Sequence, residues 1–318
     1  MLELLGEITL RNRVRAALAV VTAPEAEDGL GVRPLLGHKG GLWQRHIDRA
    51  LSGELDGLET RFHLAVVDGQ AVTNVMTVEY AGAGILGHVF TKPEHRRLGL
   101  CDVVLDMLGA DFCARGGWRL LLHTGYDSTA YHIYRGHGFK DVTPGTGFMA
   151  WVVRPEAAER WYDAEPARVA PYTWRHWPAL GQLLADDFGD GLQALWCEAF
   201  GPTCFEFPGL QLQDACEQGA QAVVLEAEDG RALALASLVP DRRWRGVRLL
   251  DLVGAPGTAE HWGELLAALD LSGGQVQAWM PAAATARRAA IEARGLRQEA
   301  LLRDQLGPGG DVVVYGCG

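Results

Sequence analysis

Short apolar runs separated by turn residues follow one another between residues 61 and 91. RFHLAVV at 61–67 and AVTNVMTVEY at 71–80 flank an Asp-Gly pair, which is typical of a β-hairpin. ILGHVFT at 85–91 follows the turn AGAG at 81–84 and predicts a third strand. We expect an antiparallel meander from these three runs, preceded by a helix over residues 41–57.

The hydrophobic period changes after the meander. From residue 98 to 115 apolar side chains recur at the i, i+3 and i+4 positions of an amphipathic helix, which Gly116 and Gly117 end. The elements expected after this helix are a strand at 119–124, a helix at 128–137 and a strand at 148–153. This order predicts an α+β domain with a mixed, mainly antiparallel sheet.

The second half of the chain has its own version of this succession, at an offset of roughly 155 residues. Its expected strands are at 221–226, 232–239, 248–254, 275–280 and 311–316, and its expected helices at 257–269 and 285–294. We interpret the succession as a tandem duplication. It divides the chain into a domain at 1–153, a linker at 154–171, which is charged, proline-punctuated and expected to contain a helix, and a second domain at 172–318.

Length and composition agree with two ordinary globular domains. The chain has 318 residues, of which 48% are hydrophobic and 22% charged. No apolar run is long enough to span a membrane, and the N-terminus lacks a secretory pattern, so we expect a cytoplasmic protein. The net charge of -11 argues against a nucleic-acid partner.

The cysteines indicate neither disulfides nor a metal site. No CxxC pair occurs, and no histidine pair stands near them at zinc-like spacing. We expect reduced thiols at positions 101, 113, 197, 204, 216 and 317.

The stretch PEHRRLGLC at 93–101 places two arginines and a glycine where a predicted strand feeds a predicted helix. Its ordinary interpretation is a strand-to-helix turn with solvated charges. The alternative is a phosphate pocket, in which free N–H groups of residues 97–102 converge at the start of the helix. Gly99 would let the backbone approach a pyrophosphate, and Arg96 and Arg97 would add charge-assisted hydrogen bonds.

Two motifs of this region resemble those of the GNAT N-acetyltransferases. FTKPEHRRLGLCDVVLDML is similar to the family's acetyl-CoA motif R/Q-x-x-G-x-G/A, with Arg96 and Gly99 in place and Cys101 for the last Gly or Ala. DSTAYHIYRGHGF at 127–139 is similar to N-x-x-A-x-x-x-Y-x-x-x-G-F. Its residues in register are Asp127 (for Asn), Ala130, Tyr134, Gly138 and Phe139. The resemblance covers about residues 60–153 and implies that both domains have the GNAT fold.

The resemblance implies direct transfer of an acetyl group from acetyl-CoA to a primary amine of a small molecule or peptide. The strand before the phosphate turn would splay from its neighbour to admit the pantetheine. Tyr134 would be the general acid that protonates the CoA thiolate, although the same residue also fits a core position on an amphipathic helix. The residues implied to bind acetyl-CoA are Val89, Phe90, Thr91, Arg96, Arg97, Leu98, Gly99, Leu100, Cys101, Asp102, Asp127 and Ala130.

The sequence assigns no general base. The positions that match the family's bases are Ile85, Gly87 and Leu122, and none of these side chains accepts a proton. Strand alternation predicts that the neighbouring histidines point to the opposite face. The candidates that stay open are, in order, His123, His88 and Glu79, besides deprotonation through water or arrival of a neutral amine.

The second half lacks this chemistry. After DLVG it reads APGTAEHWGE, without the acetyl-CoA motif, and Ile291 stands four residues before Gly295 where Tyr134 stands before Gly138. We therefore expect a degenerate second domain. Two alternatives to an enzyme are a non-catalytic acyl-CoA-binding or sensor protein and a scaffold without a ligand; either a monomer or a homodimer fits the sequence.

Overall fold

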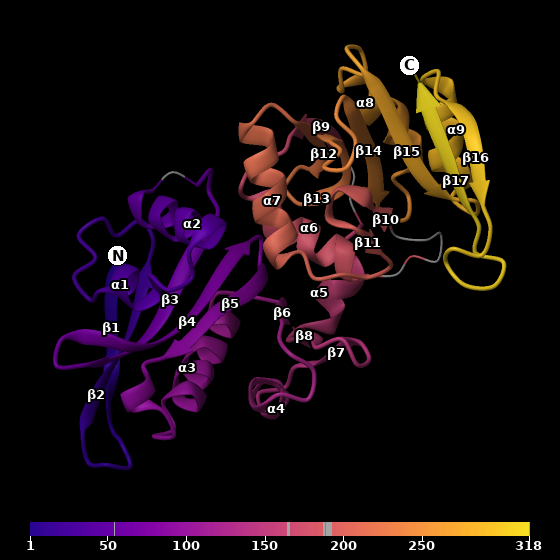
Figure 1. Ribbon diagram of the computed structural model, residues 1–318. Helices are drawn as coiled ribbons and strands as arrows, with labels where there is room; N and C mark the ends of the chain where they lie inside the picture. The colour runs from indigo at the N-terminus through magenta and orange to yellow at the C-terminus, as the bar shows by residue number, and fades with distance from the viewer. Residues whose placement is uncertain (54, 164–165, 187, 189–192, 318) are drawn as a thin grey trace. The chain divides into compact units, whose positions relative to one another are not determined.

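The structure is a computed structural model that describes residues 1–53, 55–163, 166–186, 188 and 193–317. The chain divides into two compact units, Met1–Ala158 and Glu159–Gly318. Each unit contains a mixed, mainly antiparallel sheet flanked by helices (Figure 1). The predicted α+β class is thus confirmed.

The first unit has an eight-stranded sheet in the order β1-β2-β3-β4-β5-β6-β8-β7. Every neighbouring pair is antiparallel except β5 and β6, which run parallel. The strands are β1 (Leu2–Thr9), β2 (Arg15–Thr22), β3 (Glu59–Val67), β4 (Gln70–Tyr80), β5 (Ala83–Thr91), β6 (Arg119–His123), β7 (Lys140–Thr143) and β8 (Phe148–Val152).

Helices cover the sheet of the first unit. They are α1 (Val32–Leu36), α2 (Gly41–Ser52), α3 (Leu100–Ala114), α4 (Thr129–Gly136) and α5 (Pro155–Arg160), with a 3-10 turn η1 (Pro93–His95) before α3. Helix α3 lies along β3, β4 and β5 (Figure 1). Its apolar side chains Val104, Leu108 and Phe112 are buried in a core cluster against the sheet, and burial of each stabilises the fold by roughly 2 kcal/mol.

The predicted meander, the strands at 119–124 and 148–153 and the helices around them are all present. The sequence did not predict β1, β2, α1 or β7. Nearly every residue of β1 is exposed, so this edge strand carries no burial pattern that could be read from the sequence.

The second unit has a seven-stranded sheet in the order β16-β17-β15-β14-β13-β12-β9 and a separate two-stranded sheet. The large sheet contains β9 (Ala167–Pro171), β12 (Gln221–Ala227), β13 (Ala232–Pro240), β14 (Val247–Gly254), β15 (Gln275–Pro281), β16 (Arg297–Leu302) and β17 (Val312–Cys317). The small one pairs β10 (Gln193–Ala194) with β11 (Ala199–Phe200). The helices are α6 (His176–Ala185), α7 (Glu206–Glu217), α8 (Trp262–Ala267) and α9 (Thr285–Ala293), with 3-10 turns η2 (Leu195–Cys197) and η3 (Ala259–His261).

Both large sheets have the same strand order. Read from its other edge, the second sheet runs β9-β12-β13-β14-β15-β17-β16, which corresponds strand for strand to β2-β3-β4-β5-β6-β8-β7. The parallel pair also recurs at the same place, as β5 with β6 and as β14 with β15. This correspondence fits the predicted tandem duplication.

The stretch 154–171, expected as a helix plus linker, contains the helix and, in addition, a strand that the sequence did not predict. Residues 155–160 form α5, and residues 167–171 form β9, which pairs with β12 at the edge of the second sheet. The six cysteines are free. Within the described ranges, no helix has the length and hydropathy needed to cross a membrane.

Candidate active site

A gap opens between β5 and β6 in the first unit. The two strands pair only where Ala83–Ile85 lies beside Arg119–Leu121, and the described residues form no further pair between them. From Leu86 to Thr91 the edge of β5 that faces β6 therefore has no partner strand. The predicted pantetheine-binding residues Val89, Phe90 and Thr91 all lie in this part of β5.

A β-bulge at His88 interrupts β5 within the gap. Asn74 of β4 pairs with Phe90 and Met76 pairs with Gly87, so two residues of β5 face the single residue between them on β4. His88 has a φ of 52°, a left-handed conformation that costs a non-glycine residue about 1–2 kcal/mol. The Asn74 Nδ2 group donates a hydrogen bond of 2.8 Å to the His88 carbonyl oxygen and stabilises this conformation.

The bulge changes the face toward which His88 points. Leu86 and Val89 both pack in the core cluster under α3, whereas the His88 ring contacts Trp43 of α2 on the other face. Gly87 is one of the positions at which members of the family carry a base, and it lies on the face opposite to Leu86. His88 therefore points to the same face as that base position. The expectation that alternation turns His88 away is therefore wrong, because an extra residue breaks the period of two.

His88 is a neutral, buried imidazole. Its ring is 6% exposed and meets Trp43 edge to face at 4.7 Å between centroids. Burial, and then the charges of His46, Lys39 and His38, lower the pKa of His88 to about 3. The Nε2 atom of His88 is buried and has no hydrogen-bond partner among the described residues. Burial also lowers the pKa of His46 to about 3.

The phosphate turn joins β5 to α3. Arg97 and Gly99 both have positive φ, 62° and 86°, and Gly99 is the N-cap of α3 without a side-chain cap. In the described part of the chain, the backbone N–H groups of residues 97–102 have no acceptor. A Cβ atom on Gly99 would meet no other atom within 4 Å, so the space in front of these N–H groups is open. Unsatisfied N–H groups at a helix start are suited to an anion.

Arg96 folds back toward the end of β5. Its Nε atom donates a hydrogen bond of 3.0 Å to the Thr91 carbonyl oxygen, and its guanidinium lies over the Phe90 ring at 5.8 Å. The Phe90 ring also meets the His38 ring, with 4.2 Å between centroids. Phe90, Arg96 and His38 thus form one cluster of contacts at the end of β5.

Six predicted residues meet on the α3 side of the sheet. Leu100 and Tyr134 are members of the core cluster that also contains Leu122, and the remaining four pack against it: Val89, Leu98, Cys101 and Ala130. Tyr134 is buried and meets Phe139 edge to face, with 5.9 Å between centroids. Burial, followed by the charge of Asp102, raises the pKa of the Cys101 thiol to about 11, so this residue is a protonated packing group at neutral pH.

Other predicted residues do not join this cluster through their side chains. Asp127 is exposed and has a φ of 57°. Its carboxylate accepts a hydrogen bond of 2.9 Å from His132 Nε2. The exposed carboxylate of Asp102 lies 3.4 Å from His137 Nε2. In the resemblance, Asp102 contributes only its backbone N–H, which lies at the start of α3.

Glu79 belongs to an ion-pair network away from the gap. The guanidinium of Arg115 contacts its two carboxylate oxygens at 2.6 and 3.0 Å, and the Thr77 hydroxyl donates to it. A carboxylate held in this way is not available to an incoming amine. His123 is exposed at the end of β6.

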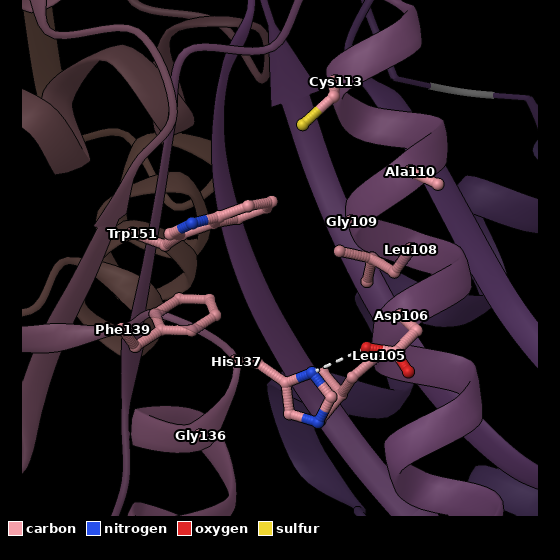
Figure 2. A pocket seen from close by; sticks show the side chains of 10 residues that line it. All are labelled: Leu105, Asp106, Leu108, Gly109, Ala110, Cys113, Gly136, His137, Phe139 and Trp151. Atoms are coloured by element: carbon pink, nitrogen blue, oxygen red, sulfur yellow. Dashed lines mark ion pairs between the residues drawn. The ribbon is translucent and has the colours of Figure 1, made fainter.

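A separate cavity lies between α3 and the end of α4. It measures about 380 Å³, and Figure 2 shows Trp151 and Phe139 facing α3 across it. His137 Nδ1 contacts Asp106 at 3.1 Å at its rim. None of the predicted site residues lines it, and carboxylates at its rim would repel a phosphate. Its lining residues are Leu105, Asp106, Leu108, Gly109, Ala110, Cys113, Gly136, His137, Phe139 and Trp151.

The sequence missed the face formed by His38, Trp43 and His88. The available signal was the spacing of three between Leu86 and Val89, which both point toward α3 and imply an extra residue between them. In the described ranges, no group of three or more His, Cys, Asp or Glu side chains is arranged to hold a metal ion.

No family model and no curated protein matches the chain. Solved structures do. A phosphinothricin acetyltransferase of the GNAT superfamily from Sinorhizobium meliloti, in complex with AcCoA, is 16% identical, with a TM-score of 0.39 over 48% of this chain and 87% of its own. The ribosomal-protein-alanine N-acetyltransferase from Brucella melitensis is 19% identical, with a TM-score of 0.37 over 47% and 98%.

A third solved structure is a GNAT family N-acetyltransferase from Escherichia coli in complex with CoA. It is 17% identical, with a TM-score of 0.36 over 45% of this chain and 84% of its own. All three of these solved structures are described as acetyltransferases, two of them of the GNAT group. At this level of identity a likeness concerns the fold alone, so the chemistry is argued from the residues of this chain.

Proposed function

We propose that the first unit is an acetyl-CoA-dependent N-acetyltransferase of the GNAT type, with a primary amine of a small molecule or peptide as its acceptor. The observation that carries the proposal is the gap between β5 and β6, which ends at a helix start whose N–H groups have no acceptor. A ligand with an extended amide chain and a pyrophosphate fits these two features together.

This geometry offers partners for the pyrophosphate and for the pantetheine amides of acetyl-CoA. The pyrophosphate accepts hydrogen bonds from the N–H groups of residues 97–102 and the positive end of the α3 dipole. The pantetheine amides pair with the free edge of β5 at Val89 and Phe90. The Arg96 guanidinium would have to leave the Thr91 carbonyl oxygen to contact a phosphate.

Transfer takes place through the gap. The acceptor nitrogen attacks the thioester carbonyl carbon, the C–N bond forms, and the C–S bond breaks. Tyr134 lies on the α3 side and gives its hydroxyl proton to the departing thiolate. Tyr134 then regains a proton from solvent, and the products are the acetylated amine and CoA.

We assign the role of proton acceptor to His88. The attacking nitrogen becomes more acidic once it has added to the carbonyl; the neutral imidazole of His88 takes its proton and then releases it to solvent. His88 is neutral at pH 7 and faces α2, on the side of the sheet opposite to Tyr134. Acid and base then act on opposite sides of the reacting carbon.

The acid is tested by Tyr134→Phe, with Tyr131→Phe as a matched control. Tyr131 lies on the same helix, but its hydroxyl donates to Asp141 at 2.8 Å. We expect Tyr134→Phe to lower the rate of CoA release with a panel of primary amines by about 10²-fold, with the Kd of acetyl-CoA unchanged. Equal rates of CoA release in the two variants would remove Tyr134 from the mechanism. Binding of acetyl-CoA to the wild type without any turnover would favour a non-catalytic acyl-CoA-binding protein.

A further inference from the structure

The second unit has the same gap in its sheet, and a segment of its own chain packs against both strands that border the gap. Strands β14 and β15 pair only where Val247–Leu249 lies beside Gln275–Gln277. The connection between α6 and α7 folds into β10, η2 and β11, and β10 contacts both β14 and β15 while η2 contacts β14. The corresponding connection of the first unit, between α1 and α2, consists only of residues 37–40.

A buried carboxylate holds this connection to β14. Asp251 is 1% exposed and accepts hydrogen bonds from the backbone N–H groups of Leu195, at 2.9 Å, and Trp196, at 3.2 Å. It stands three residues before the end of β14, as His88 stands three residues before the end of β5. Asp251 therefore occupies, in the second unit, the level at which His88 lies in the first.

An arginine reaches the same part of β14 from the opposite face. Arg287 of α9 is buried and donates a hydrogen bond of 3.0 Å to the Leu252 carbonyl oxygen. Leu252 packs in the core cluster under α8 and α9, whereas the neighbouring Asp251 points to the other face. Residues of this unit therefore contact β14 at the gap from both sides.

The connection is packed as a core element. Ala194, Leu195 and Trp196 are all buried, and the Trp196 ring meets Phe205 edge to face at 5.7 Å. A loop without a structural role would be exposed, since backbone polar groups are costly to bury without partners. Here two of the buried backbone N–H groups are satisfied by Asp251.

We propose that residues 193–200 act as a built-in occupant of the cleft of the second unit. The cleft that takes the acyl-CoA pantetheine in the first unit is filled by the chain itself in the second, so the protein binds one acyl-CoA per chain. The stoichiometry rests on the proposed function of the first unit; the docking of residues 193–200 does not.

Hydrogen exchange of the full chain tests the docking directly. We expect the amides of Leu195 and Trp196 to exchange at least 100-fold more slowly than an unstructured peptide. Asp251→Ala is expected to speed exchange in residues 193–200 by 10-fold or more and to leave residues 1–158 unchanged. Asp229→Ala, which removes an exposed carboxylate of the same unit, is the control. Peptide-like exchange of Leu195 and Trp196 in the wild type would overturn the proposal.

Asp251→Asn covers the case in which Asp251→Ala does not fold. The amide keeps one acceptor oxygen and loses the other, so exchange in residues 193–200 should rise by a smaller factor, with the unit still folded. Unchanged exchange in Asp251→Asn would contradict the role of Asp251 in holding the segment.

Calorimetric titration tests the stoichiometry. One acetyl-CoA per wild-type chain and none in Gly99→Glu is the expected result, because the variant closes the only cleft that the proposal leaves open. Two molecules per chain, or binding that persists in Gly99→Glu, would overturn the proposal. No binding to either protein would refute the function of the first unit, while the exchange experiment would still decide whether residues 193–200 are docked.

Discussion

At the scale of single residues, one inserted position decides toward which face of the sheet His88 points. The bulge at His88 turns an imidazole toward α2 that strict alternation would point toward α3. The left-handed φ of His88 is stabilised by the hydrogen bond from Asn74, which lies on the neighbouring strand β4 and which no local sequence pattern identifies. The motif residues Gly99 and Tyr134 were predicted from sequence because they follow a fixed spacing, whereas a bulge depends on the partner strand.

His88→Gln should lower kcat with primary amines by about 10²-fold, because the amide cannot take the proton of the attacking nitrogen. The Kd of acetyl-CoA should stay within twofold of the wild-type value, since His88 faces α2. His123→Gln, at an exposed position, is the matched control and should leave kcat unchanged. Loss of activity in His123→Gln alone would transfer the role of base to that residue.

The two buried histidines make the fold sensitive to acid. The pKa values of His46 and His88 are about 3 in the folded chain, against an ordinary value near 6.5 in the unfolded one. Above pH 6.5 both states are neutral and the stability is complete. Between pH 6.5 and 5 only the unfolded chain takes up these protons, so the free energy of unfolding falls by about 1.4 kcal/mol per pH unit for each histidine.

Urea titrations of the wild type and of His46→Gln between pH 6.5 and 5 measure this dependence. In His46→Gln the free energy of unfolding should depend less steeply on pH, by the contribution of one histidine. A wild-type stability that stays constant over this interval would mean that the imidazoles are protonated in the folded chain.

At the scale of elements, α3 is fixed to the sheet by an ion-pair network as well as by its apolar face. Asp111 accepts bonds from Arg61 at 3.0 Å, His63 at 2.9 Å and Arg115 at 3.0 Å. Burial alone would raise the pKa of the Asp111 carboxyl, but the hydrogen bonds from His63 and Arg115 hold this pKa well below its usual range. The period of the apolar residues predicted the helix but not this network, in which Arg61 and Asp111 lie 50 residues apart along the chain.

Asp111→Ala should destabilise the first unit by about 3 kcal/mol, because two arginines near the sheet lose their shared partner. Asp106→Ala, on the exposed side of the same helix, should cost less than about 1 kcal/mol. Thermal unfolding of both variants measures the difference. Equal losses would mean that the apolar face alone holds α3.

At the scale of the whole molecule, the two units have a common sheet topology but different segments packed against it. The strand order and the parallel pair recur, which fits the tandem duplication expected from the succession of apolar runs. The docking of residues 193–200 could not be predicted, because it depends on a carboxylate of β14 meeting two N–H groups of a segment over 50 residues earlier. Period and motif thus predict strands and turns, whereas the contents of a cleft depend on contacts between distant segments.

The central claim is that PEHRRLGLC binds a pyrophosphate, and a calorimetric titration with acetyl-CoA tests it most directly. Three proteins are compared: the wild type, Gly99→Glu and Gly145→Glu. Gly145 has a φ of 79° and open space around it, so its variant carries the same strain and charge away from the turn. The account predicts binding to the wild type and Gly145→Glu and none to Gly99→Glu. Equal binding by the two variants, or none by the wild type, would contradict it.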